Sequence, residues 1–440
     1  MDRLVQLLDK GTFVRISGEE DGVVTGTGMI GGRKVCVYAH DISIKGGAMS
    51  GEMSRSIRGI MDIALQEGLP LIGLNSSSGA RIEDGVDSLA GFGEIFQKHI
   101  LASGVIPQIS GIFGPCAGGA VYSPALTDFT VMVKDSSYMF LTGPAVVRAV
   151  TGEAVTKEEL GGTKVHTTKS GAAHFAADDE AEAIRLIRDL VGYLPSNNRD
   201  AAPIVKPHEN DVCFPDDFLP ENSRKPYDMH EVIKAIVDKG KFLEVHKNWA
   251  RNIIIGLARM NGRSVGVVAN QPKTLAGALD VNASRKAARF VRFCDAFNIP
   301  LITLVDVPGF LCGTGQEYEG VITHGAKLLY AYGEATVPKV TVTLRKSYGG
   351  AHITMSCKQM RGDVNFAWPS ADIAVMGTEA AEEILGKKVC PPSLEQAVSG
   401  GHIDEIIAPS QTRLKIIQAL DSLDLVRKDI PWKKHDNMPL

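Results

Sequence analysis

Two glycine turns are the strongest candidates for chemistry in this sequence of 440 residues. They read Gly114-Pro115-Cys116-Ala117-Gly118-Gly119-Ala120 and Arg345-Lys346-Ser347-Tyr348-Gly349-Gly350-Ala351. Each follows a predicted buried strand and precedes a predicted helix start, where successive N–H groups and the positive end of a helix can bind an oxyanion. Removing one donor from an oxyanion hole typically costs about 3–4 kcal/mol of barrier. The alternative is that each Gly-Gly pair only lets a helix and a strand pack closely.

Side-chain acids and bases form no recognisable catalytic set. His166, His174, His324 and His352 stand apart, and the sequence has no HExxH, G-x-S-x-G or G-x-x-x-x-G-K-[ST] motif. Each histidine is therefore interpreted as structural. The segment Asp306-Val307-Pro308-Gly309 directly follows a predicted strand, where α/β proteins place ligands, although a tight turn explains it equally well.

An internal repeat places the two glycine turns at equivalent positions. Gly32 and Pro70 recur 230 positions later as Gly262 and Pro300, whereas Pro107 and Gly118 recur 231 positions later as Pro338 and Gly349. Four landmarks in register indicate a duplicated domain. Two equivalent oxyanion sites would suit a reaction between two carbonyl compounds.

Each half is predicted to repeat one order of strands and helices. The expected pairs are strands 33–40 and 263–269, helices 51–67 and 282–296, strands 69–75 and 299–306, helices 89–103 and 320–335, and strands 105–112 and 338–344. This alternation predicts an α/β fold with a parallel-rich sheet in each half. We predict an N-terminal domain at 1–200, a C-terminal domain at 231–440, and a proline-rich connector at 201–230 laid over the surface.

Composition and charge exclude several classes of protein. The net charge of −4 argues against a nucleic-acid partner. No apolar run approaches the roughly 18–20 residues that cross a bilayer, and the start Met1-Asp2-Arg3-Leu4 has no secretion signal. Seven scattered cysteines without a CxxC pair argue against a zinc ribbon or a disulfide scaffold, so we expect no metal site. The sequence therefore predicts a cytoplasmic protein with reduced thiols and no membrane partner.

Longer motifs resemble the carboxyltransferase (β) subunits of acyl-CoA carboxylases, most closely the propionyl-CoA carboxylase type. The C-terminal half carries this resemblance in residues 280–284, 287–292, 305–310, 348–351 and 367–369. The N-terminal half carries it in Ser77, Gly79-Ala80-Arg81-Ile82, Gly85, the run 114–129, 141–144 and 150–153. The resemblance implies two crotonase-like (ClpP/crotonase) domains, usually in a homohexamer built as a trimer of dimers.

The same resemblance implies roles for particular residues. Gly118 and Gly119 would stabilise the thioester enolate of an acyl-CoA, and Gly350 and Ala351 would hold the ureido oxygen of biotin. Further acyl-CoA contacts are implied for Ser77, Gly79, Ala80, Arg81, Ala117, Ala120 and Ile353, and further biotin contacts for Pro308, Gly309, Phe310, Tyr348 and Gly349. In the family's mechanism the biotin cofactor is the base that removes the α-proton, which explains the missing side-chain base.

The implied reaction moves a carboxyl group from carboxybiotin to the α-carbon of a short-chain acyl-CoA. The chain has neither a Met-Lys-Met biotinylation sequence nor a glycine-rich ATP site. Biotin carboxylase and a biotin carboxyl carrier protein are therefore expected as partners, either as separate chains or fused in one α subunit. Two alternatives stay open: a decarboxylase subunit acting on malonyl- or methylmalonyl-CoA, and an inactive scaffold subunit.

Several positions depart from the family's usual pattern. Ser76 and Ser78 stand where Asp and Gly are customary, Glu319 replaces a customary Gly, and the chain is shorter at its start and between Lys388 and Glu395. In the family, Asp at the position of Ile353 accompanies propionyl-CoA preference, whereas Ile accompanies acetyl-CoA or a broader range. A pocket side chain of this kind changes discrimination by about 1–3 kcal/mol, and packing alone is the other explanation. Acetyl-CoA and propionyl-CoA therefore both stay open as substrates.

Overall fold

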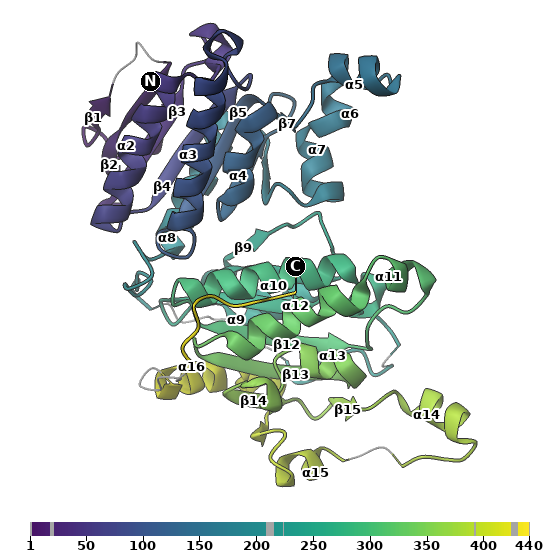
Figure 1. Ribbon diagram of the computed structural model, residues 1–440. Helices are drawn as coiled ribbons and strands as arrows, with labels where there is room; N and C mark the ends of the chain where they lie inside the picture. Colours follow the sequence, from purple (N-terminus) through teal and green to yellow (C-terminus); the bar gives the residue numbers. More distant parts are fainter. Residues whose placement is uncertain are drawn as a thin grey trace. The chain divides into compact units, whose positions relative to one another are not determined.

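Two eight-stranded sheets with the same strand order organise the chain (Figure 1). The computed structural model describes residues 2–17, 22–207, 215–222, 224–390, 393–423 and 430–439. These residues form two units, Met1–Pro203 and Ile204–Leu440. The predicted connector 201–230 therefore groups mainly with the second unit, and its residues 208–214 and 223, Cys213 among them, lie outside the described part.

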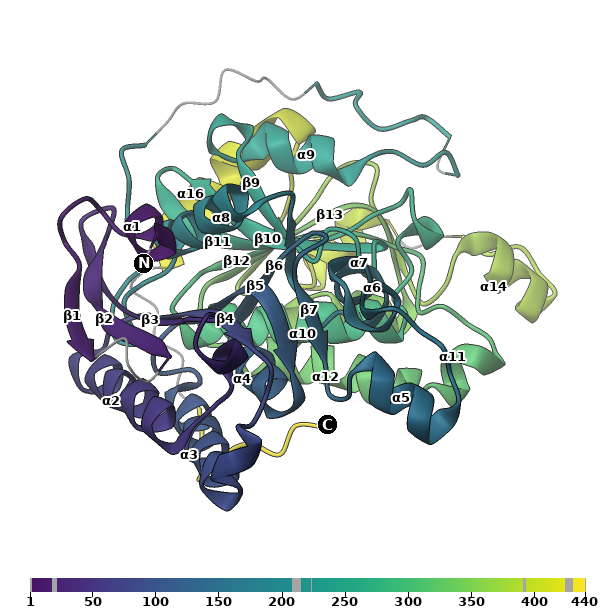
Figure 2. The same ribbon diagram turned by 90° about the horizontal axis from the view of Figure 1, so that it is seen from above.

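The N-terminal unit contains one sheet with helices on both faces. Its strands are β1 (Val14–Ser17), β2 (Val23–Ile30), β3 (Arg33–His40), β4 (Leu71–Ser77), β5 (Gln108–Ala117), β6 (Phe129–Val133), β7 (Tyr138–Phe140) and β8 (Phe175–Ala177). Its helices are α1 (Asp2–Leu7), α2 (Gly51–Glu67), α3 (Val86–Ala102), α4 (Tyr122–Leu126), α5 (Pro144–Thr151), α6 (Lys157–Gly161), α7 (Thr163–Val165) and α8 (Glu180–Tyr193). Helices α2 and α3 lie on one face of the sheet, and α1 and α8 lie on the other (Figure 2).

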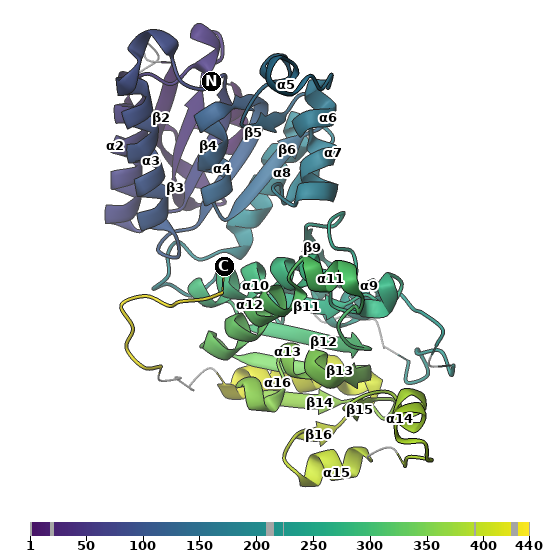
Figure 3. The ribbon, with the colours of Figure 1, turned by 45° about the vertical axis from the view of Figure 1, so that its right-hand side comes forward.

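The C-terminal unit repeats this arrangement. Its strands are β9 (Phe242–Val245), β10 (Ile253–Met260), β11 (Arg263–Asn270), β12 (Leu301–Val307), β13 (Lys339–Tyr348), β14 (Val364–Ala367), β15 (Asp372–Ala374) and β16 (Glu405–Ile406). Its helices are α9 (Met229–Ile236), α10 (Val281–Ala296), α11 (Thr314–Tyr318), α12 (Val321–Glu334), α13 (Gly349–Thr354), α14 (Thr378–Leu385), α15 (Leu394–Ser399) and α16 (Thr412–Leu423). Figure 3 shows α10 and α12 side by side on their sheet.

Both sheets combine parallel and antiparallel strands in the same order. The order is β1-β2-β3-β4-β5-β6-β8 in the first unit and β9-β10-β11-β12-β13-β14-β16 in the second. Pairing is parallel from β3 to β8 and from β11 to β16, whereas the first three strands of each sheet pair antiparallel. The predicted parallel α/β alternation is confirmed, and each sheet adds an antiparallel hairpin that the sequence pattern did not predict.

The helices that follow β3 and β11 begin at well-defined caps. Ser50 Oγ accepts the Met53 N–H at 3.1 Å, and Asp280 Oδ1 accepts the Ala283 N–H at 2.7 Å. Such caps satisfy N–H groups that have no partner inside the helix. Helix α2 ends at Gly68, whose φ of 64° is a left-handed conformation that favours glycine.

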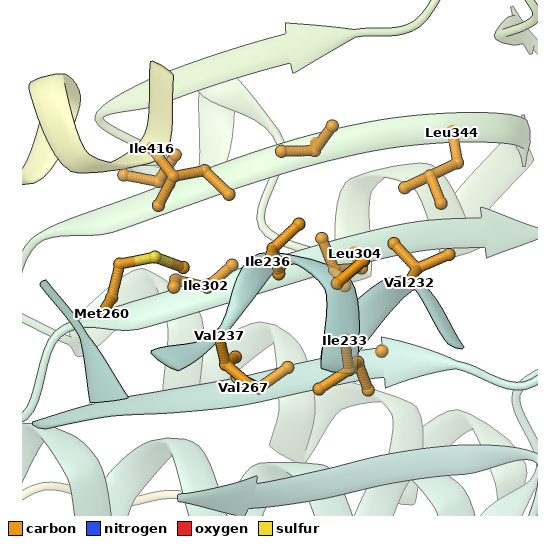
Figure 4. Packing of buried hydrophobic residues seen from close by; sticks show 14 of the residues in the cluster. Val232, Ile233, Ile236, Val237, Met260, Val267, Ile302, Leu304, Leu344 and Ile416 are labelled. Carbon is orange, nitrogen blue, oxygen red and sulfur yellow. The ribbon is translucent and has the colours of Figure 1, made fainter. Parts of the chain in front are cut away.

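One hydrophobic cluster of the C-terminal unit lies between its sheet and the helices α9 and α16. Figure 4 shows Val232, Ile233 and Ile236 pointing toward side chains of the strands, and Ile416 reaching the same layer from α16. Tyr227, in the predicted connector, is 6% exposed and belongs to this cluster. Part of the connector is therefore packed against the domain rather than lying freely on its surface.

Among the described residues of the C-terminal unit, two lysines are buried. Lys286 Nζ donates to four backbone carbonyls, the shortest distances being 2.7 Å to Ile253 O and 2.9 Å to Trp249 O. Burial lowers the pKa of Lys286 to about 7. Lys339 Nζ donates to Tyr332 O at 2.6 Å and Ala335 O at 2.9 Å, at the carboxyl end of α12, where the negative end of the helix dipole stabilises a positive charge.

No helix in the described part of the chain is long and apolar enough to cross a membrane. Among the described residues, six cysteines are free thiols, of which Cys312 and Cys390 are exposed.

Candidate active site

The first glycine turn ends β5 in the N-terminal unit. Ala117 is extended, Gly118 has a φ of 60°, and a short 3-10 helix, Gly118–Val121, follows before α4. Because the first N–H groups of a helix have no intrahelical acceptor, this turn presents backbone donors at the carboxyl edge of the sheet. Gly119 packs against the ring of Phe92, and a Cβ at this position would lie 2.9 Å from the ring.

A second loop brings the predicted acyl-CoA residues to this turn. Ser77 ends β4 beside Cys116 of β5, and Ser77 Oγ accepts the Gly79 N–H at 3.2 Å. A Cβ on Gly79 would lie 3.1 Å from Ala117 O, and one on Gly118 would lie 4.0 Å from the Gly79 Cα. The two loops therefore approach so closely that only glycine fits without displacement at Gly79.

The other predicted residues of this side lie at the edge of the same site. Ala80 forms a parallel bridge with Met49, and Arg81 N donates to Met49 O at 2.9 Å. The Arg81 side chain extends toward Asp84, with 3.9 Å between Nη1 and Oδ2. Ala120 is buried, and its carbonyl accepts the Cys116 thiol at 3.1 Å. Burial raises the pKa of Cys116 to about 12, so this thiol stays protonated as a donor.

The second glycine turn repeats this geometry at the end of β13. Tyr348 is extended, Gly349 has a φ of 56°, and α13 begins at Gly349. The Tyr348 hydroxyl donates to Asp372 Oδ2, and burial, followed by this hydrogen bond with Asp372, raises the pKa of Tyr348. A Cβ on Gly350 would lie 3.8 Å from the Phe310 ring, an ordinary van der Waals contact, whereas one on Gly349 would lie 3.0 Å from Val375 O.

The loop Pro308-Gly309-Phe310 lies beside the second turn in the same way that the loop of residues 78–80 lies beside the first. Leu279 N donates to Gly309 O at 3.1 Å, and Leu311 N donates to Leu279 O at 2.7 Å. The equivalent bonds in the N-terminal unit run from Met49 N to Gly79 O and from Arg81 N to Met49 O. The structure therefore brings Phe310 to Gly350, whereas Pro308 and Gly309 shape the loop behind it.

The residues after the second turn differ in exposure. Ala351 is fully buried, and Ile353 is 45% exposed. His352 Nδ1 lies 2.9 Å from Ser347 Oγ, and burial lowers the pKa of His352. Of the departures noted in the sequence, Ser78 and Glu319 are exposed and Ser76 is buried.

Sequence reasoning missed a buried ion pair beneath the second turn. Arg345 Nε donates to Asp306 Oδ2 at 3.0 Å, and the side chains are 7% and 1% exposed. The Asp306 segment was noted as a strand end, but nothing in its local pattern indicates an arginine partner 39 residues later. The described residues contain no cluster of three or more His, Cys, Asp or Glu side chains that could hold a metal ion.

Comparisons with known proteins agree with this fold and show the family. The carboxyl transferase domain family matches residues 12–391. The chain is 56% identical over 440 residues to the propionyl-CoA carboxylase beta chain of Roseobacter denitrificans, covering 96% of this chain and 86% of the relative. It is 55% identical over 474 residues to the mitochondrial propionyl-CoA carboxylase beta chain of Homo sapiens, covering 100% and 88%.

A solved structure matches the whole chain. It is transcarboxylase 12S, described as a hexamer assembly with hydrolysed methylmalonyl-coenzyme A bound, at a TM-score of 0.96 and 45% identity. The match covers 100% of this chain and 92% of that one.

Two crotonase-like domains, together with the family match, define an acyl-CoA carboxyltransferase. The chain belongs to the carboxyl transferase domain family, as the carboxyltransferase subunit of a biotin-dependent acyl-CoA carboxylase. The family and the duplicated crotonase-like fold predicted from the sequence are confirmed.

Proposed function

We propose that each glycine turn stabilises one of the two oxygens on which charge develops during carboxyl transfer. The N–H groups of Gly118 and Gly119 bind the thioester oxygen of the acyl-CoA, and those of Gly350 and Ala351 bind the ureido oxygen of biotin. The observation that carries this proposal is the recurrence of one backbone turn, with left-handed Gly118 and Gly349, at equivalent strand ends.

Neighbouring residues shape the two sites. The loops around the acyl-CoA side contain Ser77, Gly79, Ala80, Arg81, Ala117 and Ala120. The loops around the biotin side contain Pro308, Gly309, Phe310, Tyr348 and Gly349. The nearest atom to a Cβ built on Gly350 belongs to the Phe310 ring, at 3.8 Å, so we assign Phe310 to the wall of the biotin side. When bound, carboxybiotin supplies the carboxyl group and the base for the α-proton. The chain positions the reactants and stabilises negative charge at fixed amide donors.

The substrate is proposed to be a short-chain acyl-CoA, either propionyl-CoA or acetyl-CoA. Propionyl-CoA is supported by the names of the relatives and by the methylmalonyl-coenzyme A in the transcarboxylase structure. The half-exposed Ile353 lies two residues beyond Ala351, where it can narrow an acyl pocket. Exchange of Ile353 for Asp should change the ratio of propionyl-CoA to acetyl-CoA turnover by about tenfold, because one apolar pocket contact is worth roughly 1–3 kcal/mol.

The partners proposed for this chain are biotin carboxylase and a biotin carboxyl carrier protein. A homohexamer built as a trimer of dimers is supported by the hexamer described for transcarboxylase 12S. The cytoplasmic location stays a prediction.

Decarboxylation of malonyl-CoA and methylmalonyl-CoA by the purified chain, with and without free biotin, tests this function. Mass spectrometry would follow the loss of the carboxyl group. We expect loss that depends on biotin, with the preferred substrate indicating the acyl group. Loss without biotin would favour a stand-alone decarboxylase, and no loss from a folded oligomer would favour a scaffold subunit.

A further inference from the structure

The strand that leads into the second glycine turn contains a large bulge. On β12 and β13, Val305 pairs with Thr343 and Val307 pairs with Ser347, so that the single residue Asp306 faces three residues of β13. A bulge removes backbone groups from the ladder of the sheet and must satisfy them elsewhere. The aim of the turn just beyond this bulge therefore depends on what holds the bulge.

The carboxylate of Asp306 binds two of the three bulge residues of β13, Arg345 and Lys346. Asp306 Oδ1 accepts the Lys346 N–H at 3.2 Å, and Oδ2 accepts Arg345 Nε at 3.0 Å. The Asp306 N–H in turn donates to Asn270 Oδ1 at 3.2 Å, at the end of β11. Asp306 thus joins three neighbouring strands: its carboxylate binds β13, and its backbone N–H binds Asn270 at the end of β11.

The same bulge in the N-terminal unit is built without charge. Asn75 pairs with Ile112 and Ser77 pairs with Cys116, so that Ser76 faces Phe113, Gly114 and Pro115. Pro115 stands in the place of Lys346 and has no N–H to satisfy. A Cβ on Gly114 would lie 2.4 Å from Ser76 Oγ, so the serine hydroxyl covers a glycine where Arg345 stands in the other unit.

Arg345 also joins the bulge to the predicted connector. Its Nη1 donates to Lys225 O at 2.9 Å, and its guanidinium lies 5.1 Å from the centre of the Tyr227 ring. Only 7% of the Arg345 side chain is exposed, so its guanidinium is largely shielded from water. Breaking a buried charged pair leaves the other charge without compensation, which is far more disruptive than breaking a surface pair.

We propose that Asp306 and Arg345 are positioning residues, which fix the bulge of β13 and thereby aim the Gly350 and Ala351 amides at their ligand. The proposal rests on the biotin-side function assigned above to that turn. Neither side chain touches the reacting atoms. Misplacement of donors by about 1 Å can reduce a rate by about 10²-fold, so loosening this bulge should reduce the biotin-dependent step selectively.

The test compares the wild-type chain with Arg345→Met and Asp306→Ser, using methylmalonyl-CoA and free biotin as probes. We expect kcat/KM for biotin to fall roughly 10–100-fold. The Kd for methylmalonyl-CoA should change much less, because the Gly118–Gly119 turn belongs to the other unit and only Ile353 is assigned to the acyl-CoA side from this one. Amide hydrogen exchange of the peptide 345–351 should accelerate at least about tenfold in both variants, because the bulge opens more often.

A matched control is a second buried pair of the same unit. Arg413 Nη2 donates to Asp238 Oδ1 at 2.6 Å, with side chains 18% and 7% exposed, and neither residue belongs to the bulge or the turn. Arg413→Met should therefore destabilise the unit but leave both the biotin kinetics and exchange at 345–351 unchanged. Equal effects of Arg413→Met and Arg345→Met would overturn the proposal.

A rescue variant tests the mechanism directly. The triple exchange Asp306→Ser, Arg345→Gly and Lys346→Pro installs the uncharged arrangement of the N-terminal unit and removes the amide that needs an acceptor. It should recover at least about tenfold of the biotin kcat/KM lost in Asp306→Ser, and its exchange at 347–351 should return toward that of the wild type. A triple variant no better than Asp306→Ser would reject the proposal.

These readouts separate the inference from the function on which it rests. Wild-type protein without any biotin-dependent turnover rejects the proposed function, and hydrogen exchange then still tests the role of the ion pair in holding the bulge. Wild-type turnover with unchanged kinetics and exchange in Arg345→Met rejects the positioning role alone.

Discussion

The two glycine turns share a backbone but differ in what surrounds them. Gly119 is pressed against the Phe92 ring, whereas Gly350 has only a distant contact with Phe310. Below the first turn a thiol, Cys116, donates to a backbone carbonyl, and below the second turn Ser347 pairs with a histidine. Both copies of the duplicated domain thus keep the same backbone turn, whereas the side chains around the turn differ. This difference is expected if the two turns bind different molecules.

The largest expected contrast is between alanine at Gly119 and alanine at Gly350. Neither glycine has a positive φ, so the added methyl group acts only through space. In Gly119→Ala it would lie 2.9 Å from Phe92, and displacement of the turn should lower turnover about 100-fold and stability by roughly 1–3 kcal/mol. Gly350→Ala should lower turnover less than about tenfold, since the nearest ring atom is 3.8 Å away. Steady-state kinetics and urea unfolding of both variants would measure this.

If both alanine variants lose activity equally, the contact with Phe92 is not what distinguishes the turns. Phe92→Leu combined with Gly119→Ala provides the control, because the smaller side chain leaves room for the methyl group and should restore activity.

A second contrast lies at the start of the strand before each turn. Two hydrogen bonds join Gln108 of β5 to His99 of α3. Gln108 Oε1 lies 2.7 Å from His99 Nδ1, and Gln108 Nε2 donates to the His99 backbone carbonyl at 3.1 Å. Lys339 starts β13 at the equivalent position and caps two carbonyls at the end of α12. One unit therefore uses an amide, and the other a buried cation, to satisfy the end of the preceding helix.

Loss of the cation should be the more damaging change. Lys339→Met leaves two buried carbonyls without a donor and should lower the free energy of unfolding by about 2–4 kcal/mol, compared with about 1–2 kcal/mol for Gln108→Leu. Urea denaturation of the two variants measures the difference. The order would be reversed if release of the buried charge outweighed the lost hydrogen bonds, and Lys339→Gln would separate these contributions.

The two units should also respond to pH in opposite directions. Burial lowers the pKa of His40 to about 4 in the N-terminal unit, whereas Glu244, and then Asp228, raise the pKa of His230 in the C-terminal unit against its partial burial. His40 therefore contributes stability above pH 6.5 that is lost as the pH falls toward 4. His230 contributes stability below pH 6.5 that is lost as the pH rises through its higher folded-state value.

Lowering the pH from 7.5 to 5.5 should weaken the N-terminal unit by roughly 1 kcal/mol without weakening the C-terminal unit through His230. Hydrogen exchange read separately for each unit measures this. His40→Asn is the matched variant, because Asn270 fills the equivalent position and accepts the Asp306 N–H as His40 Nδ1 accepts the Ser76 N–H at 3.4 Å. A pH response that survives His40→Asn would point to other groups.

Much of the fold could be predicted because the internal repeat aligned the strand and helix patterns of the two halves, each of which is weak by itself. Helix 51–67 agrees with α2, and both glycine turns lie at strand ends as predicted. The predicted strands stop at 112 and 344, yet β5 and β13 continue to Ala117 and Tyr348. Their three-residue bulges let each strand pass on to a new partner, β7 or β15, and hydrophobic periodicity does not reveal such a shift.

The Asp306–Arg345 pair could not be predicted from local pattern, because its members meet only when two parallel strands align in register. The repeat did contain a usable signal. Asp306 and Arg345 occupy the positions of Ser76 and Gly114 in the other half. The two halves therefore differ at both positions of this pair, with two charged residues in one half and two uncharged residues in the other.

The buried lysines have a practical consequence for chemical labelling. Lys286 is 2% exposed and Lys339 is 0% exposed, and both amines are enclosed by carbonyls. A reagent that acylates amines should reach them only when the C-terminal unit opens, whereas exposed lysines react at once. Among the described residues of the N-terminal unit, no lysine is buried in this way. The rate of acylation at these two lysines therefore reports how often the C-terminal unit opens. Peptide mass mapping can measure this rate without any engineered probe.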